Sequence, residues 1–470
     1  MAATLPRNNS SKTTLDNNSI DDATLGLTPE YRKRFTKLSE ENALTVSHYI
    51  VSMKSESNSL SDNYRRGIIK VLTMFSIFCK NKPFHDSTRQ DLLSFLDTFR
   101  KPESIDPMHM WIGTYNVYRT NLTQFFRWLY FPDISAKDRT TKPLHVIENI
   151  SRLKRREVSI YKPSDLWTPD DDRLFLKFCP SKRISCYHMI SRDLSGRPDE
   201  ILKLKIREIF FRTAGDRQYA EVLVNGKTGS RHIPLINSIP FVKDYLDHEH
   251  PQPRNPNAPF ICGTGKSLGR HIGVRALYAV YINYQKKFFP KLLKDQNVSL
   301  EDKEGIRYLL RKPWNPYIRR HTALTEKSLN PKIAHILNQH AGWVQGSAMA
   351  QKYLHYFSNA SSESILEAYG IVPTEKKQSN TLKPKICTNC FESNKPDSKF
   401  CASCRMVLTY DAYNETLENQ KEKESEVQRL QEKYQQDMKA MREDIKLELK
   451  NEIAQLISKL KPEIVREGFS

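Results

Sequence analysis

The segment HAGWVQGSAMAQKYLHY, residues 340–356, sets Trp343 in a glycine-flanked turn and follows it with a short amphipathic stretch. The last four residues hold three candidate nucleophiles or bases, Tyr353, His355 and Tyr356. A phenol in such a stretch is ordinarily a core side chain of an amphipathic helix. It becomes a candidate nucleophile only when groups elsewhere in the chain activate it and bind its substrate.

The net charge of the chain favours a polyanionic partner. The 470 residues carry a formal net charge of +20, which suits a ligand contacted along many phosphates. Residues 411–470 hold 11 Lys and Arg against 14 Asp and Glu, a net charge of −3, so the first 410 residues carry +23. We therefore expect nucleic acid rather than a small-molecule substrate. A generally lysine-rich soluble surface is the alternative.

The composition predicts a cytoplasmic protein without a membrane segment. The chain has no run of 18 apolar residues, and residues 1–27 lack the apolar stretch of a signal peptide. Because these residues are rich in Asn, Ser, Thr and Asp, we expect a disordered tail there. Four cysteines are scattered among apolar neighbours, as reduced thiols of cytosolic proteins usually are: Cys79, Cys179, Cys186 and Cys262.

Residues 28–150 show apolar residues at steps of three and four, for example in NYRRGIIKVLTMFSIFCKN. This spacing predicts a small all-helical domain. Some of its cations lie among aromatic residues and could contact a phosphate backbone, although such cations usually belong to a solvated face: Arg65, Arg66, Lys70, Arg119 and Arg127. The basic stretch SRLKRREVSIYKPSD, residues 151–165, lacks periodicity and is interpreted as a linker that lies along DNA.

A second domain, residues 166–372, is predicted to be mainly helical with a small antiparallel sheet. Thr168, Pro169 and the acidic turn after them are typical of a helix N-terminus. The stretch YAEVLVNGKTGSRHIPLI alternates with a period of two around residues 225–230, which predicts a β-hairpin. Helical spacing dominates again from residue 275 to residue 369. The expected fold class of this domain is therefore α+β.

Two pieces of the second domain offer cations for a phosphoryl group. In SGRPDEILKLK, Arg197 opens a helix and Glu200 lies three residues later on the same face. The guanidinium fork of an arginine can bind a phosphate through two parallel hydrogen bonds, whereas a structural ion pair is the simpler explanation of this piece alone. Lys227 lies at the tip of the hairpin, where it either reaches a DNA strand or is only solvent-exposed.

Two later pieces add an arginine and a phenol. NPYIRRHTALTEK starts a helix at its proline and places Tyr317, Arg320 and His321 within one turn of one another. The opening segment then places Trp343 ten residues before Tyr353. Each piece has an ordinary structural explanation by itself, but the order and spacing of all four together do not.

In that order and spacing, the chain resembles the tyrosine recombinase, or phage integrase, family. The family pattern is an arginine in a GxRxxE setting, a hairpin lysine, an HxxRH helix, a GH or GW turn, and a tyrosine nine or ten residues later. The spelling GW..GS.M...Y.H looks most like archaeal integrases. The match covers about residues 162–369, and the front domain looks like the family's core-binding domain. The matching positions are, in order, Arg197, Lys227, Arg320, Trp343 and Tyr353.

The chain departs from the family pattern at two positions. Most members have histidine where this chain has Tyr317, and Arg319 replaces a usual leucine. A phenol at position 317 could still donate a hydrogen bond to a phosphate oxygen. Tyr356 is a rival nucleophile one turn beyond Tyr353, and the spacing from Trp343 favours Tyr353.

The resemblance implies a site-specific recombinase of double-stranded DNA that uses no ATP, metal or other cofactor in catalysis. Arg197 and Arg320 would neutralise the scissile phosphate, and Trp343 would donate its indole N–H. Lys227 would protonate the leaving 5′-oxygen, and Tyr353 would hold the 3′-phosphate covalently until a 5′-hydroxyl reseals it. A non-catalytic DNA-binding or architectural protein on the same scaffold is the alternative. A relaxing activity like that of type IB topoisomerases would use the same chemistry.

Two CxxC knuckles separated by ten residues occur in CTNCFESNKPDSKFCASC. Each knuckle presents two thiolates to one tetrahedral ion, so this spacing predicts a structural zinc ribbon over residues 385–408, after a linker at residues 373–384. Free or disulfide-bonded cysteines are the alternative. The predicted zinc ligands are Cys387, Cys390, Cys401 and Cys404.

Residues 410–462 are predicted to form a coiled-coil helix. From Val427 to Leu460, apolar residues recur in nine steps over 33 residues, about 3.67 residues per step. This eleven-residue rhythm predicts a nearly straight or slightly right-handed bundle. We expect the helix to join copies of the chain into a homo-oligomer on DNA. A single charged helix that packs on its own protein is the alternative.

Overall fold

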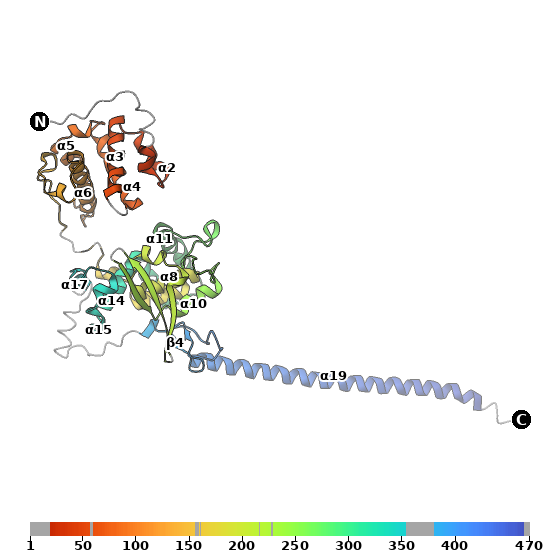
Figure 1. The fold of residues 1–470 in the computed structure, drawn as a ribbon. Helices are drawn as coiled ribbons and strands as arrows, with labels where there is room; N and C mark the ends of the chain where they lie inside the picture. Colours follow the sequence, from red (N-terminus) through yellow and green to blue (C-terminus); the bar gives the residue numbers. More distant parts are fainter. Residues whose placement is uncertain are drawn as a thin grey trace. The chain divides into compact units, whose positions relative to one another are not determined.

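The computed structural model describes residues 19–56, 60–155, 159, 161–215, 217–226, 229–353 and 380–464. The chain divides into two compact units, residues 1–160 and residues 161–470 (Figure 1). The boundary between the units falls inside the segment that the sequence assigns to a linker, residues 151–165. Within the described ranges, no helix combines the length and the apolar character that crossing a membrane requires.

The first unit is all helical, as its three- and four-residue spacing predicts. Ser61 caps one helix and Thr88 forms a capping box at another, so local sequence sets where both begin. Phe75, Phe125 and Phe126 are fully buried at its centre. The main helices are α2 (Pro29–Phe35), α3 (Glu40–Glu56), α4 (Asp62–Phe78), α5 (Arg89–Asp97) and α6 (Trp111–Tyr130), with 3-10 turns η1 (Phe84–Asp86), η2 (Asp138–Thr141) and η3 (His145–Ile147).

The structure differs from two expectations for this unit. Residues 19–24 are helical and Ala23 is fully buried. The prediction of a disordered tail over residues 1–27 is therefore wrong for these residues. Arg65, expected on a solvated face or in contact with a phosphate backbone, is buried. Its guanidinium donates to the carbonyl oxygens of Ala23 and Leu25 and pairs with Asp62. Helical periodicity alone does not distinguish such an arginine from a solvated one, because its long stem reaches polar partners from a buried position.

The second unit contains a three-stranded antiparallel sheet. Its strands are β1 (Ile209–Ala214), β2 (Arg217–Gly226) and β3 (Gly229–Leu235), in the order β1-β2-β3. The predicted hairpin is confirmed, with Gly226 opposite Gly229. The sequence did not predict β1, because only its first residue is buried and its side chains show no alternation of burial.

Helices complete the second unit. The one nearest its centre is α8 (Lys182–Leu194), whose side chains are almost all buried. In the same core Phe175 stacks on Tyr281 and on Phe289, and Trp314 meets Phe289 edge to face. The other helical elements are η4 (Pro163–Asp165), α7 (Pro169–Phe178), α9 (Pro198–Leu202), η5 (Ile206–Glu208), α10 (Ile239–His248), η6 (Gly265–Ser267), α11 (Val274–Asn283), η7 (Tyr284–Phe288), α12 (Phe289–Leu292), α13 (Leu300–Leu310), α14 (Pro316–Ser328), α15 (Pro331–Ala334), α16 (Leu337–Ala341) and α17 (Met349–Lys352).

A cysteine module and a long helix end the described chain. The module contains η9 (Asn380–Leu382), β4 (Lys385–Ile386) and β5 (Ser393–Asn394), and α19 (Tyr410–Ile464) follows it (Figure 1). Leu382 is buried against Met189 and Phe241, so the expected linker, residues 373–384, is packed at its end. The helix predicted at residues 410–462 is confirmed as α19. From residue 417 to residue 459 every side chain of α19 is exposed.

Candidate active site and metal centre

Arg320 belongs to a cluster of polar and aromatic side chains in the second unit that also contains Arg197, Trp343 and Tyr353. Two hydrogen bonds to backbone groups hold its guanidinium in place. It lies on α14, whose first turn is capped by the side-chain oxygen of Asn315. Only 2% of Arg320 is exposed. Its Nη1 donates to the carbonyl oxygen of Ser195 at 2.5 Å, and its Nη2 donates to that of Ala341 at 2.8 Å. Two bonds to backbone groups of separate elements fix the plane of the guanidinium.

Arg197 occupies the N-cap of α9 and is held by a carboxylate. Its Nη1 donates to Glu200 Oε1 at 2.7 Å, while Glu200 Oε2 accepts from Arg231 Nη2 at 2.8 Å. Burial raises the pKa of Glu200, but the hydrogen bonds from Arg231 and Arg197 outweigh burial and bring the pKa below its ordinary value. The side chain of Arg197 remains 31% exposed. The ion pair that explains this motif most simply is therefore present, and it leaves part of the guanidinium accessible.

A left-handed turn after α16 brings Trp343 to the cluster. Gly342 has a φ of +64°, a left-handed backbone that favours glycine, and a Cβ there would lie 2.6 Å from Arg231 Nη1 and displace the end of that side chain. Just before the turn, His340 Nε2 lies 3.2 Å from Ser195 Oγ. This contact connects the turn to Ser195, the residue whose carbonyl oxygen accepts a hydrogen bond from Arg320.

Tyr353 follows α17 and is only 2% exposed. Its ring stacks on Trp343, with centroids 5.5 Å apart and an interplanar angle of 21°. The Arg320 Cζ atom lies 5.7 Å from the centroid of the Trp343 ring. The phenol oxygen of Tyr353 lies 3.1 Å from Nδ1 of His321. The phenol is thus enclosed by an indole and an imidazole beside a guanidinium.

Electrostatic interactions connect the members of this cluster. Burial raises the pKa of Tyr353 to about 12, and the charges of Arg320 and Arg197 oppose that rise. Burial lowers the pKa of Arg320, and the neighbouring charge of Arg197 lowers it further. The two guanidinium groups repel each other beside a buried phenol. A bound anion would offset this repulsion.

Tyr317 lies beside the cluster and is 42% exposed, with its ring centroid 5.4 Å from that of His321. Lys227 follows the last residue of β2 in the sequence and lies outside the described residues, as do His355 and Tyr356. Of the predicted active-site residues, the described chain brings these five together: Arg197, Tyr317, Arg320, Trp343 and Tyr353.

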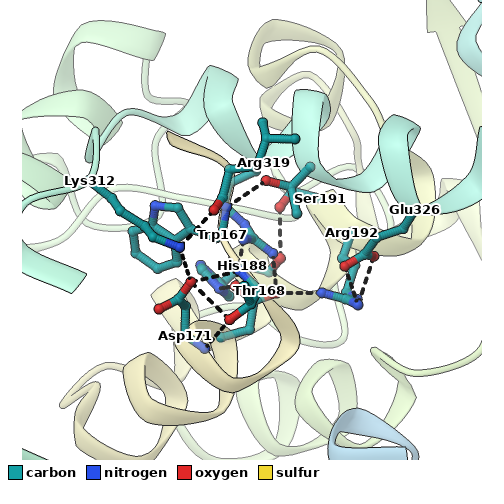
Figure 2. A network of polar contacts seen from close by, with 12 residues as sticks. Trp167, Thr168, Asp171, His188, Ser191, Arg192, Lys312, Arg319 and Glu326 are labelled. Atoms are coloured by element: carbon teal, nitrogen blue, oxygen red, sulfur yellow. Dashed lines mark hydrogen bonds and ion pairs between the residues drawn. The ribbon is translucent and has the colours of Figure 1, made fainter. Parts of the chain in front are cut away.

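Arg319, on the same helix turn, enters a buried polar network instead (Figure 2). Its Nη1 and Nη2 donate to the two carboxylate oxygens of Asp172 at 2.5 and 2.8 Å. Arg192 donates to Asp172 at 2.5 Å and to Glu326 at 2.7 Å, and His188 Nε2 lies 3.0 Å from Asp172. Burial raises the pKa of Asp172, but Arg319 and His188 outweigh it, so the net pKa lies below its ordinary value. The network thus has an ionised carboxylate at its centre.

The four predicted metal ligands form one cluster. The Sγ atoms of Cys387, Cys390, Cys401 and Cys404 all lie within 4.8 Å of one another. Zinc–sulfur bonds of about 2.3 Å in a tetrahedron place sulfur atoms roughly 3.8 Å apart. The Cys387–Cys404 and Cys390–Cys401 pairs are 3.5 and 3.6 Å apart. The donor set and its spacing therefore fit a zinc ion.

Both cysteine knuckles share one backbone arrangement. The N–H of Phe391 donates to the carbonyl oxygen of Cys387, and the N–H of Arg405 donates to that of Cys401, each at 3.0 Å. Phe391 and Arg405 both have left-handed backbone, with φ of +57° and +63°. Equivalent geometry presents each pair of thiols toward the other, which supports a single shared ion.

Arg231, Ser195 and His340 contact the cluster but were not singled out by sequence patterns. For Arg231 a signal exists, because it alternates with the buried Ile233 and Leu235 on β3, where a charged side chain needs a buried partner. Ser195 and His340 carry no comparable signal, since their contact joins two loops that are distant in sequence.

No protein-family model and no curated protein matches the chain. Among solved structures, the chain is similar to the XerH site-specific recombinase in its post-cleavage complex with palindromic difH substrate. The TM-score is 0.45 and the identity is 16%, with 76% of this chain and 96% of that chain covered. It is also similar to the Tn1549 transposon integrase in complex with transposon right end DNA, with a TM-score of 0.45, 13% identity, and 69% and 99% covered. A lambda integrase dimer bound to a COC′ core site gives a TM-score of 0.43 and 11% identity, with 72% and 84% covered. These similarities concern the fold and not the reaction.

Proposed function

We propose that this chain is a site-specific recombinase that cuts and rejoins double-stranded DNA through a covalent bond between Tyr353 and a 3′-phosphate. The observation that carries the proposal is the convergence of two arginines, an indole and a phenol from separate elements on one buried cluster. A phosphodiester is negatively charged, so an attacking phenol needs that charge neutralised before it can approach. Two guanidinium groups beside the phenol supply that neutralisation.

In the proposed reaction, pre-placed donors bind the non-bridging oxygens of the phosphate. Arg320 uses two of its five N–H donors on backbone carbonyls, and we assign its remaining donors to the phosphate. The exposed part of Arg197 binds the same group, and Trp343 donates its indole N–H. These contacts strengthen as charge accumulates in the transition state, so they accelerate the chemical step.

We assign two further roles in the reaction. Lys227, which follows β2 in the sequence, protonates the leaving 5′-oxygen. Tyr317 donates its phenol O–H to a phosphate oxygen. The phosphotyrosyl bond at Tyr353 keeps the energy of the broken phosphodiester, so resealing by a 5′-hydroxyl does not require ATP.

A library of nicked duplexes with randomised sequence tests the proposal, because cleavage beside the nick releases a short strand and traps the enzyme. We expect a denaturant-resistant protein–DNA adduct with the wild-type chain and none with Tyr353→Phe. Arg320→Gln should form it roughly 10²- to 10³-fold more slowly, the usual effect of losing one transition-state donor. Tyr308→Phe, at an exposed tyrosine of α13, is the matched control and should behave as wild type.

Other outcomes assign the chemistry elsewhere. An adduct that survives Tyr353→Phe and disappears in Tyr356→Phe would make Tyr356 the nucleophile. DNA binding without any adduct would favour a non-catalytic DNA-binding protein, the alternative suggested by the departure from the family pattern at Tyr317. Relaxation of supercoils without strand exchange would indicate a topoisomerase-like activity instead.

The C-terminal parts complete the proposal. We assign a structural zinc ion to the four cysteines, since four thiolates complete a tetrahedral shell and leave no open position. We assign to α19 the binding of a second copy of the chain, because apolar residues such as Leu430, Met441 and Ile445 are exposed along it. A chain that remains monomeric in light scattering, with and without DNA, would contradict this last assignment.

A further inference from the structure

His321 contacts the phenol to which the proposed function assigns nucleophilic attack. It follows Arg320 on α14, and its Nδ1 lies 3.1 Å from the Tyr353 oxygen. The two rings are stacked with centroids 5.8 Å apart and an interplanar angle of 29°. Only 9% of His321 and 2% of Tyr353 are exposed, so solvent has little access to this contact. The imidazole is therefore a base within hydrogen-bond reach of the reacting oxygen.

The surroundings keep His321 uncharged and able to accept a proton. The rings of Tyr161 and Tyr317 lie 5.0 and 5.4 Å from its ring. Burial, together with the charges of Lys352 and Arg320, lowers the pKa of His321 to about 4. Burial raises the pKa of Tyr353 to about 12, so the phenol keeps its proton at neutral pH. An attack by Tyr353 must therefore dispose of that proton during the step.

We propose that His321 is the general base that accepts the phenol proton of Tyr353 as the phenol oxygen attacks the DNA phosphate. This inference rests on the proposed function and adds a catalytic residue to it. Tyr317 also lies beside His321, but it is 42% exposed, whereas Nδ1 of His321 lies 3.1 Å from the phenol oxygen of Tyr353. The negative phosphate in the occupied site also stabilises the imidazolium that forms.

Each proton of the proposed cleavage step has a donor and an acceptor. The bond from the Tyr353 oxygen to phosphorus forms while the phenol proton moves to Nδ1 of His321, and the bond from phosphorus to the 5′-oxygen breaks. The leaving oxygen keeps the electron pair of that bond and takes a proton from Lys227. During resealing the 5′-hydroxyl oxygen attacks phosphorus and passes its proton to the neutral amine of Lys227, while the bond from phosphorus to the Tyr353 oxygen breaks and the imidazolium returns its proton to that oxygen. Arg320 and Lys352 disfavour the imidazolium once the phosphate is released, which favours that return.

The test measures single-turnover cleavage of a nicked duplex selected from the randomised library, from pH 6 to pH 9. A general base contributes about 10²- to 10⁴-fold, so we expect His321→Gln to cleave more slowly by that factor. The wild-type rate should be nearly independent of pH, because the base is already neutral. The His321→Gln rate should rise with pH, since only the small phenolate fraction then attacks. His335→Gln, at an exposed histidine of the same unit, should match wild type.

A change at position 321 also alters the surroundings of the other side chains that face it, which are Tyr161, Tyr317, Arg320 and Lys352. A second experiment therefore keeps His321 and changes the nucleophile, or combines the two changes. A ring-fluorinated tyrosine at position 353, whose phenol ionises near neutral pH, should restore most of the rate of His321→Gln and remove its pH dependence. In the chain with His321 intact, the same replacement should reduce the solvent deuterium isotope effect on cleavage. The second result remains informative if His321→Gln does not fold.

The outcomes separate this inference from the function on which it rests. A wild-type chain that forms no adduct overturns the recombinase proposal itself. A wild-type chain that forms the adduct, together with a His321→Gln variant that matches its rate and pH profile, overturns only the role of His321. A slower variant with a flat pH profile and no rescue by the fluorinated tyrosine also overturns it, because His321 would then only position the phenol.

Discussion

At the scale of single residues, three histidines of the second unit lie where a positive charge is poorly tolerated. Burial is the main cause that lowers the pKa of His188 to about 4, of His321 to about 4 and of His340 to about 3. Nearby cations add to the effect at each position. The ordinary pKa of histidine is about 6.5, so below that pH the unfolded chain binds more protons than the folded chain.

We therefore expect the second unit to lose stability as pH falls from 6.5 toward 5. Each histidine with a lowered pKa makes its full contribution to the free energy of unfolding above pH 6.5. That contribution falls by about 2 kcal/mol by pH 5. Glu326, whose pKa burial raises, acts in the opposite direction. Urea unfolding at pH 7.5 and pH 5.0 measures the difference. His188→Gln should reduce it and His335→Gln should not, and an undiminished pH effect in His188→Gln would contradict this explanation.

At the scale of elements, α14 is held against α7 by charge as well as by packing. The carboxylate of Asp172, on α7, accepts hydrogen bonds from Nη1 and Nη2 of Arg319, which is the immediate neighbour of Arg320. Lys312, just before α14, donates to Asp171 at 2.6 Å (Figure 2). Since α14 also carries His321, these contacts set the position of the helix that supplies the candidate active site.

Asp172→Asn should destabilise the second unit by about 3–5 kcal/mol, because it leaves the buried Arg319 with a neutral partner and Arg192 with Glu326 as its carboxylate partner. Asp170→Asn is the matched control on the same helix. Its salt bridge to Arg173 spans 3.8 Å at the surface, where removal should change stability by no more than about 1 kcal/mol. Denaturant unfolding of both variants tests the difference. Equal stability of the two variants would show that the network does not hold α14 in place.

At the scale of the whole molecule, the cysteine module connects α19 to the rest of the second unit. Lys395 of the module pairs with Asp244 of α10 at 2.5 Å, and Glu392 pairs with Lys243 at 2.6 Å. Leu382 adds an apolar contact to the same face. The position of α19 therefore depends on a small module that has little apolar core and whose proposed zinc ion supplies folding free energy.

Removing the zinc, by chelation or by Cys401→Ser, should release the module from α10. We expect loss of one zinc ion per chain and faster hydrogen exchange over residues 380–409, while exchange in α8 and α14 stays slow. Cys79→Ser, at a cysteine of the first unit outside the cluster, should retain both the metal and the slow exchange. Unchanged exchange after complete metal loss would mean that the module folds without the ion.

Much of the architecture was predictable because it depends on local patterns. The caps of α7 and α14, the hairpin of β2 and β3, and the two cysteine knuckles are each set by residues close together in the sequence. The edge strand β1 was missed because its exposed side chains show no period of two. Arg65 was assigned to the wrong environment because periodicity does not show which long side chains find buried partners.

Local sequence patterns are enough to show which chemical groups are present, in what order, and on which kind of element each one lies. They predict Arg197 at a helix start, Arg320 on a later helix and Tyr353 beyond a glycine turn. Folding brings these groups into one cluster, turns Arg319 toward Asp172 instead, and places His321 against the phenol. The physical reason is that backbone propensity and burial period act over a few residues. Contacts between charged groups that are more than a hundred positions apart arise only when packed helices bring them within hydrogen-bond distance.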